Sequence, residues 1–323
     1  MRAGCFLLFA CGTLIAQNTT TTTATIVGAG YATPQNFIKA APGQVISLMV
    51  YGLDPRLDQP VTATGTPLPF TLAGFSVSFK EGNITVPVPL LGISQQPCAD
   101  LYDVTAGLCQ WLTVISMEVP FELQPDCRGC LRLPIPHFFV VADAGVAKTM
   151  IAALLPPDNI HITDGCDTTA PLSQTATCGK IVAHADGTRV DANHPAKVGE
   201  ELVMYAFGLG RTDPLVTSGT ATPNPPPQLP ASQFGLNFDS TTNAAPSLPA
   251  LLASPWFDYT PLPPVYVGLV PGFVGLYQAN FTVPPAPAVK PYIACGGSIA
   301  SNLTVTLFTT NSFDGAGICV KPQ

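Results

Sequence analysis

Short apolar runs, many of them alternating with polar residues, recur along the chain between segments rich in Pro and Gly. Val45–Tyr51 and Phe75–Phe79 show the alternation of half-buried strands, whose successive side chains point to opposite faces of a sheet. Similar patterns predict further strands at Ile84–Leu90, Leu112–Phe121, Phe138–Ala142, Leu202–Phe207, Val265–Leu269, Leu276–Val283 and Leu303–Phe308. The pattern predicts a helix only over Ala144–Leu155, ended by Pro156 and Pro157. Many short strands without intervening helices predict an all-β fold.

An internal repeat divides the chain. Ala41–Leu53 (APGQVISLMVYGL) aligns with Lys197–Leu209 (KVGEELVMYAFGL), so that Gly43 matches Gly199. Two later pairs of segments also match: Phe75–Phe79 with Phe234–Phe238, and Met117–Pro120 with Phe281–Pro284. We therefore expect two tandem immunoglobulin-like β-sandwich domains, the second carrying a proline-rich insertion at Thr222–Pro264. The predicted parts are a signal peptide (1–16), a Thr-rich leader (17–30), domain 1 (31–143), a connector with the first strands of domain 2 (144–195) and domain 2 (196–323).

The chain's first residues and its composition indicate export. Arg2, the apolar run Cys5–Ile15 and the small residue Ala16 form a signal-peptide pattern, and a lipoprotein acylated at Cys11 is the alternative. Charged residues make up 10% of the 323 residues, against about 25% in ordinary soluble domains. The net charge of −7 provides no basic surface for nucleic acid. No later segment reaches about 18 uninterrupted apolar residues, so we expect no transmembrane segment. The expected location is therefore secreted or at the cell surface, in the periplasm or outside the cell.

Cysteine usage agrees with an oxidising compartment. Eight cysteines follow the predicted signal peptide, an even number that suggests four disulfides. Their clustering favours local bridges, although Cys127 and Cys130 can also bridge to other loops. The predicted pairs are Cys98–Cys109, Cys127–Cys130, Cys166–Cys178 and Cys295–Cys319. The Cys-Arg-Gly-Cys spacing at 127–130 is thioredoxin-like, but its proline-flanked, turn-like context favours a structural bridge over a redox site.

Several groups of side chains are candidates for functional sites. A calcium or zinc site can be assembled from the acids and histidines of one segment, namely His161, Asp164, His184, Asp186, Asp191 and His194. These residues lack a regular ligand spacing, and Asp186-Gly187 is more simply a type I′ hairpin turn, so no metal and no cofactor is expected. The acids Glu81, Asp100, Asp103, Glu118 and Glu122 offer carboxylates for glycoside cleavage, with nothing to single out a pair. No Gly-x-Ser-x-Gly nucleophile motif occurs.

Aromatic residues in the second half are the best candidates for binding. Trp256, Phe257 and Tyr259 lie in the proline-rich insertion, where exposed aromatic rings can bind glycans or a cell-surface protein. Three further aromatic residues are expected to fill the core instead: Tyr266, Phe273 and Tyr277.

One stretch of the second half resembles a known family. Val265–Pro284 contains GLVPGFVGLYQ, and Asp186–Pro195 and Met204–Gly210 add to the likeness. These segments resemble the exported bacterial family with the Solibacter-type uncharacterised C-terminal domain, and looser matches begin at Ala41. The resemblance implies an immunoglobulin-like, exported protein, and the family carries no established activity. The function expected is therefore an exported, non-enzymatic binding or structural module of the bacterial cell surface or extracellular matrix. The alternative is a carbohydrate-active or other secreted hydrolase with its site in the insertion loops.

Overall fold

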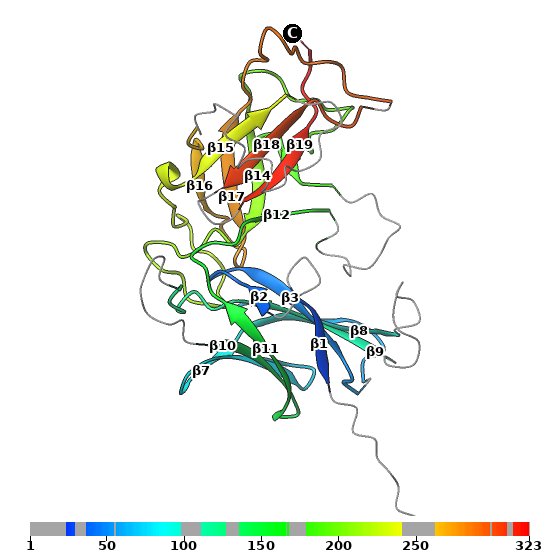
Figure 1. The fold of residues 1–323 in the computed structure, drawn as a ribbon, viewed down its shortest axis with the longest axis vertical. Coiled ribbons are helices and arrows are strands. Elements are labelled where there is room, and N and C mark those ends of the chain that lie inside the picture. Colours follow the sequence, from blue (N-terminus) through cyan, green and yellow to red (C-terminus); the bar gives the residue numbers. More distant parts are fainter. Residues whose placement is uncertain are drawn as a thin grey trace, which may run out of the picture.

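The computed structural model describes residues 24–29, 37–54, 56–97, 111–126, 136–165, 167, 179–240, 262–297, 299–308 and 313–322. Apart from the short 3₁₀ helix η2 (Ala231–Gln233), the regular structure of these residues is β-strand. The strands form two stacked halves, with the N-terminal half below the C-terminal half in Figure 1. The predicted all-β class is confirmed.

The N-terminal half consists of two sheets around one core. The first sheet has the order β1 (Thr25–Ala29), β3 (Val45–Tyr51), β9 (Trp111–Glu118), β8 (Leu90–Pro97) and β4 (Val61–Thr62). The second has the order β2 (Phe37–Lys39), β11 (Val146–Leu154), β10 (His137–Asp143), β6 (Phe75–Glu81) and β5 (Thr71–Leu72), and β7 (Ile84–Val88) also pairs with β6. Only the pairing of β2 with β11 is parallel among the strand pairs of this half that the structure describes. Leu48 and Ile115 from one sheet and Phe79 and Phe139 from the other belong to the same buried cluster.

The C-terminal half repeats this plan. Its first sheet has the order β12 (His161–Ile162), β14 (Glu201–Phe207), β17 (Tyr277–Thr282) and β16 (Tyr266–Leu269), and β13 (Val182–Ala183) also pairs with β14. Its second sheet has the order β15 (Gly235–Asp239), β18 (Leu303–Phe308) and β19 (Phe313–Ile318). Both sheets contribute to one core, which includes Met204 and Phe281 from the first and Leu236 and Val305 from the second.

The sequence repeat corresponds to equivalent strands. The three matched segments form β3 and β14, β6 and β15, and β9 and β17. The glycines before and after β3 have φ of +77° at both Gly43 and Gly52, and their counterparts Gly199 and Gly208 have +81° and +77°. These left-handed conformations explain why glycine recurs at both positions, since other residues adopt them at a cost.

The predicted helix at 144–155 is wrong, because this segment forms β11. Ala144 and Gly145 both have positive φ, at 47° and 78°, and turn the chain back so that β11 pairs with β10 along its length. Three apolar residues spaced four apart, as on one face of a helix, are exposed to solvent in the strand: Val146, Met150 and Leu154. Sheet pairing has overridden the local helical pattern.

Two other local predictions also need correction. The apolar run Ile84–Leu90 is divided at Pro89, because β7 ends at Val88 and β8 begins at Leu90 in the other sheet. The turn at Asp186-Gly187 is not of type I′, which needs positive φ at both central residues. Gly187 donates to the carbonyl of His184, and in this turn only Gly187 has a positive φ, of 84°.

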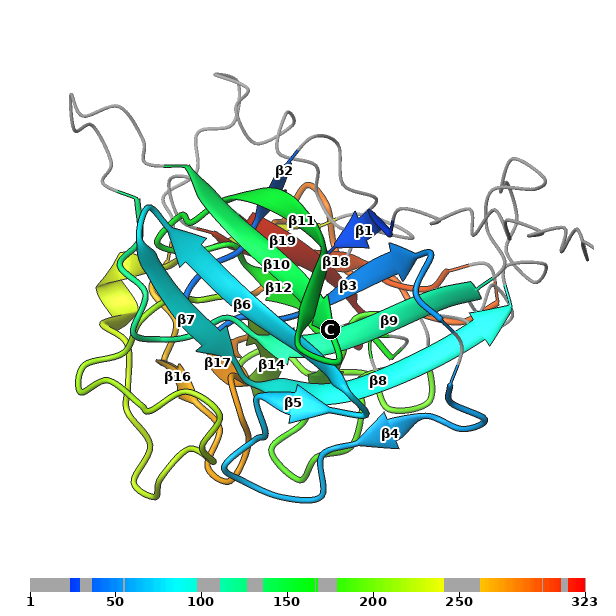
Figure 2. The same cartoon turned by 90° about the horizontal axis from the view of Figure 1, so that it is seen from below.

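The halves contact each other through loops. Figure 2, which views the molecule from below, shows β14 and β17 behind the strands of the N-terminal half. The long connection from β14 to β15 reaches the N-terminal half at residues 218 and 219, where its backbone bonds to Leu68 and Glu122.

Candidate functional site at the junction of the halves

A fully buried glutamate lies where the two halves meet. Glu118 is the last residue of β9 and pairs with Val45, the first residue of β3. Its exposed fraction is 0%, because the C-terminal half covers this end of the sheet. The Glu118 Oε2 atom accepts a hydrogen bond from the backbone N–H of Gly219, and Oε1 has no hydrogen-bond partner. A buried carboxyl group with one unpartnered oxygen is costly to ionise.

Burial raises the pKa of Glu118 from its ordinary value of 4.5 to about 8. The hydrogen bond from Gly219 opposes this shift, and the nearby charge of Glu122 adds to it. At neutral pH the Glu118 side chain is therefore mostly the uncharged acid.

The turn between β16 and β17 packs against the same carboxyl group. A Cβ atom at Gly275 would lie 2.5 Å from the carbonyl oxygen of Gly43 and 3.5 Å from Glu118 Oε1. Because the first of these distances is a clash with backbone, only glycine fits there without movement. Two residues further on, Tyr277 is fully buried and donates its hydroxyl hydrogen to the carbonyl of Gly210. Burial, together with the nearby Glu118, raises the pKa of Tyr277.

A second carboxylate holds the loop that covers Glu118. Ser218 donates its backbone N–H and its hydroxyl hydrogen to the two oxygens of Glu122, and its Oγ accepts a hydrogen bond of 2.7 Å from the Phe121 N–H. Phe121 follows β9 in the chain, but its side chain is buried in the core of the C-terminal half. Arg211 adds a 2.7 Å hydrogen bond to Gln124.

An amide pair, the buried Gln44 and the half-buried Asn159, forms the other side of the junction. Gln44 Nε2 donates to the Asn159 carbonyl at 3.0 Å, and Asn159 Nδ2 donates to Gln44 Oε1 at 3.2 Å. The Asn159 N–H in turn donates to the carbonyl of Gly208, where a Cβ atom would lie 2.3 Å from the Asn159 oxygen. Glycines at 208 and 275 thus allow the two backbones to approach closely.

The Glu118–Glu122 pair shares one feature with a glycosidase site, an acid with a raised pKa near a second carboxyl group, but lacks the access. An uncharged acid beside a second carboxyl group is the arrangement that divides acid and base roles in such enzymes. However, Glu118 has no exposed surface, and Glu122 is engaged by Ser218. The arrangement can hold the two halves together, but it does not present the acid to a substrate.

A second polar cluster joins the two sheets of the C-terminal half. His161 Nε2 lies 3.0 Å from Asp167 Oδ2, and His161 Nδ1 lies 3.3 Å from Asp314 Oδ2 on β19. Lys180 Nζ lies 2.8 Å from the same Asp314 oxygen and donates to the carbonyl of Ile162. Burial opposes protonation of His161, but its hydrogen bonds to the two aspartates raise its pKa. With a carboxylate at each ring nitrogen, His161 is suited to linking the sheets rather than to acting as a base.

The six residues predicted as possible metal ligands bond to other partners instead. His184 Nδ1 lies 2.7 Å from Glu200, Asp191 bonds to the backbone and ring of His194, and Asp186 accepts from the Thr188 N–H. Asp164 forms a backbone bridge with Lys180. Within the described ranges, no three His, Cys, Asp or Glu side chains come together as metal ligands.

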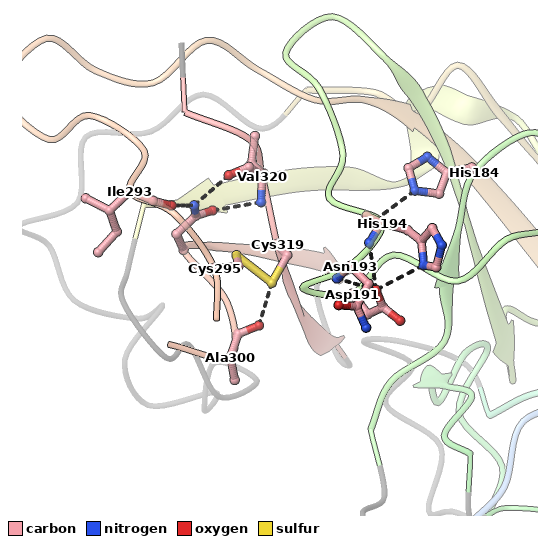
Figure 3. The surroundings of a disulfide bond; sticks show 10 residues. His184, Asp191, Asn193, His194, Ile293, Cys295, Ala300, Cys319 and Val320 are labelled. Atoms are coloured by element: carbon pink, nitrogen blue, oxygen red, sulfur yellow. Dashed lines mark hydrogen bonds and ion pairs between the residues drawn. A yellow bond between two sulfur atoms is a disulfide. The ribbon is translucent and has the colours of Figure 1, made fainter. Parts of the chain in front are cut away.

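One predicted disulfide is confirmed. Cys295 and Cys319 are bonded, with their Cα atoms 5.6 Å apart (Figure 3). Asn302 accepts from the Val320 N–H and donates to the carbonyls of Ile293 and Val320, which holds this last segment in place. The other six cysteines lie outside the described residues: Cys98, Cys109, Cys127, Cys130, Cys166 and Cys178.

The predicted aromatic binding residues Trp256, Phe257 and Tyr259 also lie outside the described residues. Of the three aromatic residues assigned to the core, Tyr277 is fully buried, whereas Phe273 is 56% exposed, so that assignment is wrong for Phe273. It occupies the turn between β16 and β17, where its carbonyl accepts from the Thr222 N–H while its ring projects outward.

The junction was missed at the sequence level, although Glu118 was among the acids considered. The sequence feature that indicates the junction is Glu118 itself, a single acid within the apolar strand Leu112–Phe121.

Comparison with known proteins adds no relative. No family model matches the chain, and no curated protein matches it. In the part of the chain that the structure covers, none of the helices has the length and apolar character needed to cross a membrane.

Proposed function

We propose that this chain is an exported, non-enzymatic binding or structural module, built from two immunoglobulin-like domains held as one unit. The observation that carries this proposal is the junction, where buried side chains of one half bond to the backbone of the other. A linker alone would leave two independent domains, whereas these contacts suit a protein that presents a fixed surface.

The strand order supports the immunoglobulin-like assignment. In that fold, strands A, B, E and D form one sheet and strands C, F and G the other. The order β1-β3-β9-β8 facing β11-β10-β6 corresponds to this arrangement, as does β12-β14-β17-β16 facing β19-β18-β15. In both halves an early segment also runs parallel to the last strand, through β2 with β11 and through the bridge of Ala196 with Val320.

The family assignment remains part of the proposal. The motif Gly268–Gln278 supplies Gly275 and Tyr277, which have specific roles at the junction. The motif on which the resemblance to the Solibacter-type family rests therefore includes two residues, Gly275 and Tyr277, that this fold needs. A bacterial cell surface or extracellular matrix is the setting that this family and the Cys295–Cys319 disulfide favour.

The non-enzymatic assignment is supported by how the polar clusters are used. Glu118 is enclosed, and His161 is occupied by two aspartates. We place ligand binding in the insertion, at Trp256, Phe257 and Tyr259, since aromatic side chains suit glycan or protein ligands.

The test is binding of the mature protein to glycan and peptidoglycan arrays, with and without calcium. We expect specific binding that W256A and Y259A abolish, and that F70A preserves. Phe70 is a suitable control because it is a 47% exposed aromatic residue of the other half. Equal binding by all three variants would contradict the location of the site. An absence of binding by the wild-type protein would favour a passive structural role.

A further inference from the structure

We propose that Glu118 is a proton-dependent latch between the two halves: the acid form keeps residues 218–219 and 275 seated on the N-terminal half, and the carboxylate form loosens them. The latch goes beyond the module function proposed above, because it makes the contact between the halves depend on pH.

The geometry places the proton at a contact between halves rather than inside one core. The Glu118 carboxyl group belongs to β9 of the N-terminal half, and its one hydrogen bond comes from Gly219 of the C-terminal half. Its other oxygen faces the Gly275 turn, also from the C-terminal half. Separating these segments would expose the carboxyl group to water while leaving the β9 pairing with β3 intact.

Among the described residues, no cation offsets the charge of an ionised Glu118. Glu122, from the segment after β9, disfavours a second negative charge. Tyr277, from β17, has a raised pKa and is therefore uncharged where Glu118 ionises. The covering loop carries Arg211, which is directed to Gln124, and Asp213, which is exposed. Ionisation would therefore leave a buried charge opposed by its surroundings, and opening of the junction is the direct way to hydrate it.

The sign of the effect follows from linkage. In the open junction Glu118 is hydrated and regains a pKa near 4.5, whereas in the closed junction its pKa is about 8. The closed form therefore binds the proton more tightly, and acid favours closure. Between these two values the opening equilibrium should rise about tenfold for each pH unit and then level off.

Hydrogen exchange of the Gly219 N–H in the full chain measures this opening. After correction for the intrinsic exchange rate, we expect the opening constant to rise about tenfold per unit between pH 5 and pH 8 in the wild-type protein. The E118Q variant, which cannot ionise, should give a flat profile. As the matched control, T282E places a carboxyl group at the equivalent but exposed position of β17 and should keep the wild-type slope.

Core amides distinguish a latch from general unfolding. Leu48 in β3 and Val305 in β18 are fully buried. Global unfolding also hydrates Glu118 and so shares the pH slope, but the corrected protection of these two amides should exceed that of Gly219 at every pH. Equal protection of all three amides, or a slope at Gly219 that persists in E118Q, would overturn the proposal.

A direct titration keeps the test independent of the variant's folding. Carboxyl-carbon NMR of the wild-type protein labelled at glutamate should show one side chain, Glu118, ionising well above the others. If every glutamate is ionised by pH 6, the latch does not exist. Because this readout needs no ligand, its failure leaves the binding assay of the proposed function unaffected.

Discussion

The turns that precede β3 and β14 have the same backbone in very different surroundings. In residues 41–44 the Gln44 N–H donates to the Ala41 carbonyl at 3.0 Å, and in residues 197–200 the Glu200 N–H donates to the Lys197 carbonyl at 3.1 Å. The side chain at the fourth position closes each turn by accepting from the N–H of the first, at 2.9 Å and 2.8 Å.

Only the turn in the N-terminal half is covered. Residues 41–44 are all buried, because the C-terminal half lies on them, whereas Lys197 and Gly199 are exposed. The adjoining strand ends differ in the same way, with Glu118 buried and its counterpart Thr282 exposed.

The residue types follow this difference in burial. Where the turn is covered, the closing side chain is the uncharged Gln44, which can also donate to Asn159. Where it is open, the closing side chain is Glu200, which pairs with His184. A charged turn suits an end that is exposed to solvent, as in the polar outer faces of repeat arrays. The same local turn thus forms part of an interface with Gln44 at its fourth position and a solvent-exposed end with Glu200 there.

The largest effect should come from placing the charge in the covered turn. Q44E replaces the amide that donates to the Asn159 carbonyl with a carboxylate at a position of 0% exposure. We expect the free energy of unfolding to fall by about 3 kcal/mol at pH 7, as for other uncompensated buried charges. Urea unfolding at pH 7 and pH 5 measures this, and the loss should shrink at pH 5 as the new carboxyl group gains a proton.

The isosteric variant Q44M separates charge from the lost hydrogen bonds. It should lose less stability than Q44E at pH 7 and show no pH dependence of its own. Equal losses in both variants at both pH values would show that burial of charge does not distinguish the two turns.

The sequence predicted the repeated strands better than the junction. The alternation in Val45–Tyr51 and Phe75–Phe79 is local and survives in β3 and β6, because the side chains of each strand divide between core and surface. The helix predicted for the β11 segment was wrong for the opposite reason, because pairing with β10, a non-local interaction, outweighed a helical pattern. Glu118 could not be identified because its burial depends on Gly219, about a hundred residues away, and no strand pattern reports which end of a sheet another domain covers.

An intermediate difference between the two turns should come from adding a methyl group to the glycine of each. G43A and G199A share a positive φ, of +77° and +81°, which costs about 1–2 kcal/mol for alanine. At residue 43 the new Cβ would also lie 2.1 Å from the Phe121 ring, whereas at residue 199 nothing lies within 4 Å. Crowding of the packed ring should add about 1–3 kcal/mol to the loss in G43A.

Thermal and urea unfolding of the two variants at one pH give this difference directly. The shared backbone strain cancels when G199A is subtracted from G43A, so the remainder reports the covered surroundings alone. Equal losses would mean that Phe121 moves aside freely and that the junction is loosely packed.

The smallest effect should come from removing the charge from the open turn. Burial lowers the pKa of His184, but its hydrogen bonds to Glu200 and to the His194 carbonyl outweigh burial and raise it. Burial raises the pKa of Glu200, but the hydrogen bond to His184 outweighs burial and lowers it. The raised histidine pKa stabilises the fold below the ordinary value of 6.5 and loses this effect as pH rises through the raised value. The lowered glutamate pKa stabilises the fold above 4.5 and loses its effect as pH falls. The pair should therefore contribute most between about pH 5 and pH 6.5.

Because both side chains are partly open to solvent, we expect E200Q to cost less than about 1 kcal/mol in this window. Its amide oxygen can still accept from the Lys197 N–H, as Gln44 does from Ala41. Urea unfolding of E200Q and the wild-type protein from pH 5 to pH 8 should show curves that converge at the alkaline end, where His184 is neutral in both. A constant offset across the whole range would show that Glu200 acts through the turn rather than through the ion pair.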